Sequence, residues 1–414
     1  MKDINKWSKG KTAIIIVDCI LCLAIIVSSV LIVVDRSRQK NGVTYADTQN
    51  VQEAAQTTKA PTGSTSARLM CAGDNLIHRS IYNQAHNRAD GDGYDFSYAY
   101  EQVKEIISLS DIAFLNQETV IDPENEPSTF PCFNSPTELL SEMKNLGFNV
   151  FNQSTNHVLD KGEKGALRDI DFFKSSNVLL TGLYQTREDM LKPQTQTANG
   201  ITFSFVGFTE YLNGFRLASD SDLGLLSLDD ERYTKEEHYE LMKKMIDNAK
   251  ANSDVVCVSM HWQDEDITEP DSSQQEVMDK LMEYGADIVI GTGPHVLQPI
   301  EYRQNGDGEQ ALIIWSLGNF ISCQDKTNNL LGGIADVVVK KDFGSNKVTI
   351  ESAKLIPTIT HYTDGFSNVR IIPFKNYDDS LADNHGVNSS RFSCSYIEKF
   401  YTEMFGDKLE VDWK

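Results

Sequence analysis

Positive charge is scarce in this 414-residue chain, which carries 38 lysines and arginines against 60 aspartates and glutamates. Beyond the N-terminal segment the deficit grows, because residues 41–414 hold 31 basic and 57 acidic side chains, a net charge of −26. A domain this negative repels nucleic acid and anionic lipid at long range. We therefore expect no nucleic-acid partner, and any polyanion would have to be held by a local cation such as a bound metal ion.

Cysteine is also too scarce for a disulfide framework, with seven residues in the whole chain. Two of them lie in an apolar run near the N-terminus. Cys71 and Cys257 lie inside strand-like runs, where we expect them to be core residues. Cys132, Cys323 and Cys394 remain, so that one bridge is possible. The sequence shows no internal repeat either.

One long apolar run is present. Residues 13–34 read AIIIVDCILCLAIIVSSVLIVV, 22 residues with Asp18 as the one charge. This length is enough to span a bilayer, and the four lysines before it favour a cytoplasmic N-terminus, residues 1–12. A cleaved signal peptide would have a shorter apolar region and a small-residue cleavage site, which is not evident here. We expect an uncleaved transmembrane anchor in the cell membrane, with the main domain extracytoplasmic.

The rest of the chain divides by composition. Residues 35–66 are rich in Gln, Thr, Ala and Ser, which is typical of a flexible extracytoplasmic linker. Over residues 67–370, strand-like and helix-like segments first alternate and then strands follow strands, which predicts an α/β fold with mixed sheets. Residues 371–414 contain one predicted helix, residues 391–406, and are expected to form an extension packed on the domain.

Local signals predict several element ends. Ser135 is the expected N-cap of a helix that ends at Gly147, and Ser273 with Glu276 has the spacing of a capping box. Two β-hairpins are also predicted, at residues 298–320 and 335–356.

Side chains that can bind a metal ion follow the ends of five predicted strands. They are Asp74, Asn75 and His78 after RLMCAG, Glu118 after IAFLN, Asn156, His157 and Asp160 after FNVFNQ, His261 after VVCVSM, and His295 after IVIGTG. In open α/β sheets the carboxyl ends of the strands form the ligand crevice, so these residues can converge. Carboxylate, imidazole and amide ligands together suit a divalent ion such as Mn, Fe or Zn, and the absence of cysteine argues against a structural zinc finger.

Each residue also has a simpler interpretation. Asp74 could cap a helix, Asn156 could be a turn residue, and His157 could be a surface histidine. His261 beside Trp262 could be a core pair. The coincidence of position at several strand ends, rather than any single residue, favours a metal site.

Six segments resemble, in this order, the signature blocks of the CapA/PgsA family of poly-γ-glutamate capsule synthesis proteins. They are AGDNLIH, LNQETV, STNHVLDKG, MHWQDE, GADIVIGTGPHVLQPIE and WSLGNF, and they cover roughly residues 68–325. The resemblance implies a calcineurin-like metallophosphatase sandwich, in which two mixed sheets are flanked by helices, together with an N-terminal transmembrane helix.

The resemblance also implies roles for the strand-end residues. His157 would be the catalytic residue, placed to protonate a leaving group or to hold a phosphoryl oxygen. The metal ligands would be Asp74, His78, Glu118, Asn156, His261 and His295, holding one or two divalent ions. The substrate would contact the neighbouring residues Asn75, Asp160, Trp262 and Asn319.

Two positions depart from the family pattern. The Asp-x-His of metallophosphatases is absent, because Asn75 and Leu76 follow Asp74. Thr292 stands where a histidine is common. Both changes would weaken one of two metal positions, so a single-metal site and a site that binds without turnover both stay open.

Three functions are consistent with these observations. The first is a membrane-anchored extracytoplasmic protein of poly-γ-glutamate synthesis and export, which handles an anionic polymer and works with capsule synthesis and export proteins in the membrane. The second is a cell-surface metal-dependent phosphoesterase acting on a phosphate ester. The third is a non-catalytic scaffold with a vestigial site.

Overall fold

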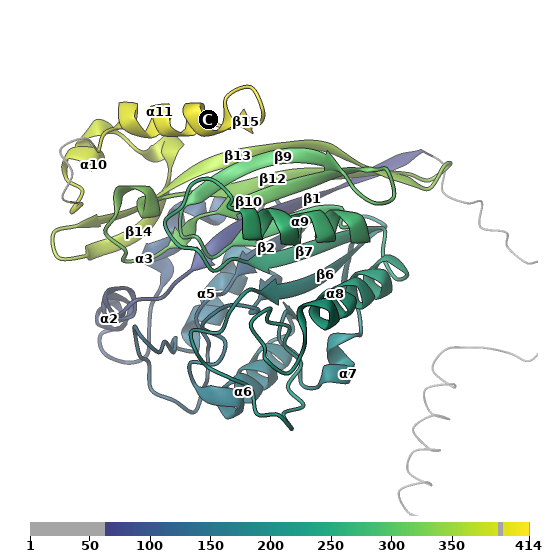
Figure 1. Cartoon of the computed structure of the whole chain (residues 1–414). Helices are drawn as coiled ribbons and strands as arrows, with labels where there is room; N and C mark the ends of the chain where they lie inside the picture. Colours follow the sequence, from purple (N-terminus) through teal and green to yellow (C-terminus); the bar gives the residue numbers. More distant parts are fainter. Residues whose placement is uncertain (1–62, 388–391, 414) are drawn as a thin grey trace, which may run out of the picture. The chain divides into compact units, whose positions relative to one another are not determined.

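Two β-sheets lie face to face in the computed structural model, which describes residues 63–387 and 392–413, and helices cover their outer sides (Figure 1). The first sheet has nine strands, seven of them in the order β14-β13-β12-β1-β2-β3-β4. Their bounds are Ser367–Pro373, Lys347–Thr363, Leu331–Asp342, Ser64–Asn75, Ile112–Asn116, Val150–Asn152 and Leu179–Thr181. Strand β11 (Asn319–Ile321) pairs with β1, and β15 (Glu410–Val411) pairs with β13. Strands β1 to β4 are parallel, whereas the pairings β1–β12, β12–β13 and β13–β14 are antiparallel.

The second sheet has six strands in the order β5-β6-β7-β8-β10-β9. Their bounds are Gln194–Ala198, Ile201–Thr209, Val255–His261, Ile288–Thr292, Gln310–Leu317 and Leu297–Gln304. The four central strands are parallel, and the two edge strands are antiparallel to them. The predicted α/β fold of two mixed sheets flanked by helices is therefore confirmed.

Ten α-helices are described between and beyond these strands. They are α2 (Arg79–Arg88), α3 (Ser97–Tyr100), α4 (Lys104–Ile107), α5 (Glu138–Leu146), α6 (Gly162–Ser175), α7 (Arg187–Met190), α8 (Lys235–Lys250), α9 (Ser272–Tyr284), α10 (Asp379–Asp383) and α11 (Cys394–Phe405). Short 3₁₀ turns lie at Glu101–Val103, Thr327–Leu330 and Phe374–Asn376.

Strand β7 shows why the central strands are apolar along their whole length. Val255 and Cys257 face the core between the two sheets, whereas Val256 and Val258 face the core beneath α8 and α9. Successive side chains point to opposite faces of a sheet, so a strand covered on both sides needs apolar residues at every position.

Two predicted helix starts are wrong. Helix α9 is capped by Asp271, whose carboxylate accepts from the amide of Gln274 at 2.8 Å, so the capping box does not involve Ser273 and Glu276. Helix α5 begins at Glu138 rather than beside Ser135, because the Ser135 hydroxyl bonds to Thr119 at 2.7 Å.

The two predicted hairpins are confirmed as β9–β10 and β12–β13. The cysteines of the described residues are all free, so the disulfide considered for Cys132, Cys323 and Cys394 is not formed. Cys71 and Cys257 are fully buried, as predicted.

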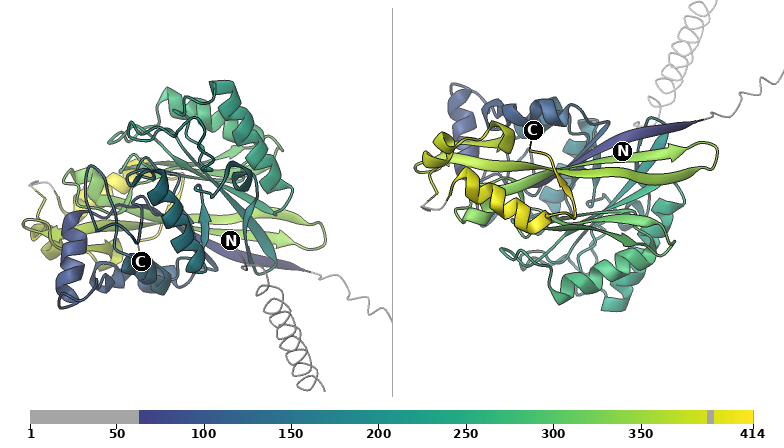
Figure 2. Two further views of the ribbon diagram at one scale, coloured as in Figure 1. Left: turned by 90° about the horizontal axis from the view of Figure 1, so that it is seen from below. Right: turned by 90° about the horizontal axis from the view of Figure 1, so that it is seen from above.

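Helix α11 from the C-terminal segment lies on the first sheet (Figure 2). Its Tyr401 hydroxyl donates to the carbonyl of Gly332 at 2.6 Å and also contacts that of Thr358. The predicted domain boundary at residue 370 falls inside β14.

The predicted N-terminal segment, the anchor at residues 13–34 and nearly all of the linker lie outside the described residues. Among the helices that the structure does describe, none combines the length and the hydropathy needed to cross a bilayer.

Gly73 allows the end of β1 to lie directly against the backbone of Gly318, the residue that follows β10. A Cβ atom at this position would lie 2.0 Å from the carbonyl oxygen of Gly318, to which the amide of Asp74 donates at 3.0 Å. Only glycine fits this contact, which fixes the position of the Asp74 backbone.

We expect Gly73→Ala to lower the free energy of unfolding by about 1–3 kcal/mol, because the added methyl group forces two backbone segments apart. Gly344→Ala is the matched control, since its nearest atom would be the flexible Asp342 carboxylate at 3.3 Å. Urea unfolding of both variants measures the effect, and equal stabilities would contradict it.

Candidate metal centre

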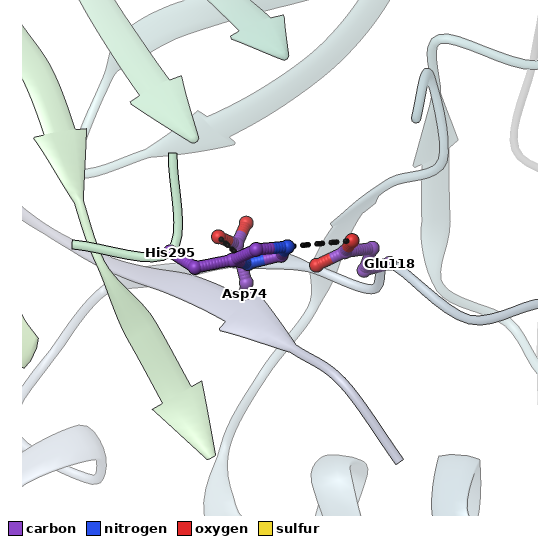
Figure 3. Close-up of side chains that lie close together, drawn as sticks. All are labelled: Asp74, Glu118 and His295. Atoms are coloured by element: carbon purple, nitrogen blue, oxygen red, sulfur yellow. Dashed lines mark hydrogen bonds and ion pairs between the residues drawn. The ribbon is translucent and has the colours of Figure 1, made fainter. Parts of the chain in front are cut away.

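Three buried side chains from different strands meet where the strands of the two sheets end. Asp74 is the last residue but one of β1, Glu118 follows β2 and His295 follows β8. One ligand atom of each lies within 4.8 Å of the others. His295 Nδ1 is 3.1 Å from Asp74 Oδ2, and His295 Nε2 is 3.7 Å from Glu118 Oε1 (Figure 3). The strand ends thus bring together three residues that are far apart in sequence.

The carboxylate of Glu118 has no hydrogen-bond partner for either oxygen, although only 1% of the residue is exposed. Burial raises its pKa well above the ordinary range, and the neighbouring carboxylates of Asp74, Glu265 and Asp160 add to the effect while His295 opposes it. A buried carboxylate without a partner is costly unless a cation compensates it. A divalent ion would supply that compensation, so the donor set fits a metal.

Both oxygens of Asp74 accept hydrogen bonds. Oδ1 accepts from Asn116 Nδ2 at 2.8 Å, Oδ2 faces His295 Nδ1, and the amide of Gly293 lies 3.2 Å from each oxygen. Burial by itself raises the pKa of Asp74, but the hydrogen bond and charge of His295, with help from His261 and Asn116, outweigh it and lower the pKa. An ionised Asp74 therefore orients the His295 ring and turns Nε2 toward Glu118.

His295 is held in a left-handed backbone conformation, with φ of +60°. The side-chain amides of Asn319 and Asn329 donate to its carbonyl oxygen at 3.3 and 3.2 Å, and Asn319 Oδ1 lies 3.1 Å from its Nδ1. Non-glycine residues adopt this conformation only when their surroundings enforce it, which is common at functional sites. Asn319 thus lies beside the His295 ring and holds its Nδ1 atom.

His261 and Asn156 form a second pair of potential ligands. His261 Nε2 lies 3.0 Å from Asn156 Oδ1, and its Nδ1 lies 3.1 Å from Thr292 Oγ1. Burial lowers the pKa of His261 to about 3, so the ring stays neutral, as a metal ligand must. Thr292, which stands where the family commonly has a histidine, therefore orients the His261 ring and supplies no imidazole of its own.

His157 lies at the edge of the centre. Its Nδ1 contacts Asp160 Oδ2 at 2.8 Å, which also accepts from the amide of Phe133 at 2.6 Å, and its Nε2 lies 3.9 Å from Glu118 Oε1. The ring of Phe133 separates His157 from His78, with ring centroids 4.7 and 5.3 Å away. His78 is therefore one aromatic ring away from His157, and its Nδ1 accepts from the amide of Cys323 at 3.1 Å.

Two residues expected to contact substrate have polar atoms bonded inside the protein. Asn75 donates to Gln117 and accepts from the Tyr100 hydroxyl, both at 2.7 Å. Trp262 packs in the core, where its Nε1 donates to the carbonyl of Trp315 at 2.9 Å.

Two asparagines that the sequence analysis did not identify form a hydrogen-bonded chain that ends on Asp74. Asn152 Nδ2 donates to Asn116 Oδ1 at 2.8 Å, and Asn116 in turn donates to Asp74. They end β3 and β2, and each is followed by glutamine. This repeated Asn-Gln at two strand ends was the signal available in the sequence.

Three further residues reach the centre from loops. Tyr211 and Asn213 accept from Asn156 Nδ2 at 2.9 and 3.3 Å. Glu265 Oε1 lies 3.9 Å from His295 Nε2. No strand-end position predicts these residues, because they lie in coil.

The metal-free chain should lose stability as the pH rises. Burial alone would lower the pKa of His295, but Glu118 and Asp74 raise it to about 10, against roughly 6.5 in the unfolded chain. Its contribution is complete below pH 6.5 and is lost as the pH approaches 10, and the raised pKa of Glu118 acts in the same direction.

Urea unfolding in EDTA should therefore show a decrease in the free energy of unfolding on the order of 2–4 kcal/mol between pH 6.5 and 9.5. The decrease should be clearly smaller in His295→Gln. The same pH profile in both proteins would contradict this role of His295.

Comparison with known proteins identifies the family of the chain. Residues 68–324 match the model of the family described as bacterial capsule synthesis protein PGA_cap. The chain is 28% identical over 239 residues to the capsule biosynthesis protein CapA of Bacillus anthracis, covering 56% of each chain. It is 31% identical over 206 residues to the PGA biosynthesis protein CapA of Bacillus subtilis strain 168, covering 50% of each. The chain spans about half the length of these curated relatives.

Two solved structures are also similar. A phosphatase from Mycoplasma pneumoniae aligns with a TM-score of 0.40 and 13% identity, over 71% of this chain and 93% of that chain. The protein TT1561 of Thermus thermophilus aligns with a TM-score of 0.33 and 9% identity, over 69% of this chain and 98% of that chain. The family model covers more than half of the sequence, and the family indicated by the sequence motifs is confirmed: the chain belongs to the bacterial capsule synthesis protein family PGA_cap.

Proposed function

We propose that this protein is a membrane-anchored, extracytoplasmic component of poly-γ-glutamate capsule synthesis and export, and that its domain acts through a bound divalent metal ion. Family membership and the name of the Bacillus subtilis relative support the capsule polymer. The apolar run at residues 13–34 supports the anchor. Partner proteins in the same membrane would carry out polymerisation and transport.

The observation that carries the metal is the unpartnered carboxylate of Glu118. It is buried, it faces His295 Nε2, and it lies in a group with Asp74 that offers three ligand atoms within 4.8 Å. Asn156 and His261 would contribute a neutral amide oxygen and an imidazole nitrogen. Mn, Fe and Zn all accept such ligands.

A bound divalent ion would polarise a phosphoryl or carbonyl oxygen and lower the pKa of water. His157 stands beside Glu118 with its Nδ1 oriented by Asp160. Its Nε2 is then free to give a proton to a leaving group or to hold an oxygen of the substrate. Tyr211 and Asn213 keep the Asn156 oxygen directed toward His261.

The His157–Asp160 pair favours one alternative function, a cell-surface phosphoesterase with the metallophosphatase-like fold expected from the sequence. An oriented imidazole beside a metal is the arrangement that general acid catalysis requires. The capsule function needs only metal-dependent capture of the polymer, whereas the phosphoesterase needs turnover. A scaffold would need neither.

Elemental analysis of the full chain, purified in detergent, tests these functions together. We expect about one or two equivalents of Mn, Fe or Zn, lost in Asp74→Ala and His261→Gln. His86→Gln is the matched control, because His86 bonds to the Gly93 carbonyl outside the centre.

Hydrolysis of an aryl phosphate ester would be measured with the same samples. The amount of capsule polymer would be measured in cells that express each variant. Metal with turnover, abolished in His157→Ala, selects the phosphoesterase. Metal without turnover, together with loss of polymer in His261→Gln, supports the capsule function. A chain that takes up no metal after reconstitution overturns the metal centre.

A further inference from the structure

We propose that Glu265 is a further ligand of the metal ion, binding together with Glu118 and the Nε2 atom of His295. The inference rests on the metal centre of the proposed function. It adds a residue from the coil between β7 and α9, residues 262–271, to a centre otherwise built from strand ends.

Two carboxylates face the same imidazole nitrogen. His295 Nε2 lies 3.9 Å from Glu265 Oε1 and 3.7 Å from Glu118 Oε1. The other ring nitrogen, Nδ1, is already engaged by Asp74 and Asn319. Among the described residues Nε2 has no hydrogen-bond partner, so it is the ring atom available to a metal.

Glu118, which carries the proposed metal centre, also supports a cation at this position. It is 1% exposed, neither of its oxygens has a partner, and its carboxylate points at Nε2 (Figure 3). Two carboxylates placed around one nitrogen repel each other, and the buried one also loses its hydration. Glu118, Glu265 and Nε2 of His295 would hold a divalent ion, whose positive charge would offset this repulsion.

The coil is fixed where it passes the centre. The Asp266 amide donates to the carbonyl of Pro294 at 2.9 Å, directly before His295, and Asp266 has a φ of +64°. The Asp266 carboxylate is paired with Lys326 and accepts from Asn329 at 3.0 Å. Asp266 is thus fully used within the protein, whereas the ion pair of Glu265 within the described chain is with His295.

Glu265 also completes a centre that has one imidazole fewer than the family pattern suggests. Thr292 bonds to His261 and supplies no ring nitrogen. Replacing an imidazole by a carboxylate adds an oxygen ligand to the set. Carboxylate oxygens are the ligands that suit Mn²⁺. The side chain is 46% exposed, so Glu265 would bind the ion from the solvent side.

Calorimetric titration of the full chain in detergent with Mn²⁺ alone measures the binding affinity and tests the proposal. We expect Glu265→Gln to weaken Mn²⁺ binding by about 10–100-fold, and Glu118→Gln to weaken it at least as much. Glu269→Gln is the matched control, because it makes the same change of charge at an exposed position of the same coil. Its affinity should equal that of the wild type.

The outcomes separate this proposal from the metal centre itself. Wild-type binding that is unchanged in Glu265→Gln but lost in Glu118→Gln overturns the role of Glu265 and leaves the centre standing. No Mn²⁺ binding by the wild type overturns both. Equal melting temperatures of wild type and Glu265→Gln in EDTA would establish that a lost affinity reflects a lost ligand, and a marked drop would contradict the direct role.

Discussion

The carboxylate of Asp74 ties the two sheets together at the edge where the centre lies. Asp74 lies near the end of β1 in the first sheet, yet its carboxylate accepts from the amide of Gly293, which follows β8 of the second sheet. It also faces His295 and Asn116. The relative position of the two strand edges and the direction of the His295 ring therefore depend on one buried anion. Its loss would leave a buried amide and an imidazole without their partner, so the stability of the fold depends on this carboxylate.

Elsewhere the fold provides partners for buried carboxylates, which makes Glu118 informative. Asp122, close in sequence, is paired with Arg168 and accepts from the Glu124 amide. Glu118 is the one carboxylate among the described residues whose two oxygens are both buried and without a hydrogen bond. Glu118 has no such arginine. It faces only the imidazoles of His295 and His157 among the described residues, whose Nε2 atoms lie 3.7 and 3.9 Å from its Oε1. A buried carboxylate at a strand end, with no hydrogen bond and beside an imidazole, is a feature that a bound cation would stabilise.

The sequence predicts the fold well where signals are periodic and poorly where several local signals overlap. Apolar runs located the strands, and Asn305-Gly306 between two of them indicated the first hairpin. The start of α9 was misplaced because Asp271 with Gln274 and Ser273 with Glu276 both have capping-box spacing, and only tertiary structure selects between them. Strand-end positions identified the central group, but Glu265 was missed because coil has no period from which its direction could be read.

Charge decides how such a domain can handle an anionic polymer. Residues 41–414 carry a net charge of −26, so long-range attraction cannot deliver the polymer. Lys326, near the centre, is already paired with Asp266. Under the proposed function, a divalent ion on Glu118 and His295 would be the positive charge that an incoming carboxylate or phosphate contacts. Glu265 would bind the same ion from the solvent side. Capture would then depend on metal occupancy at short range, and the acidic surface would release any chain that the ion does not hold.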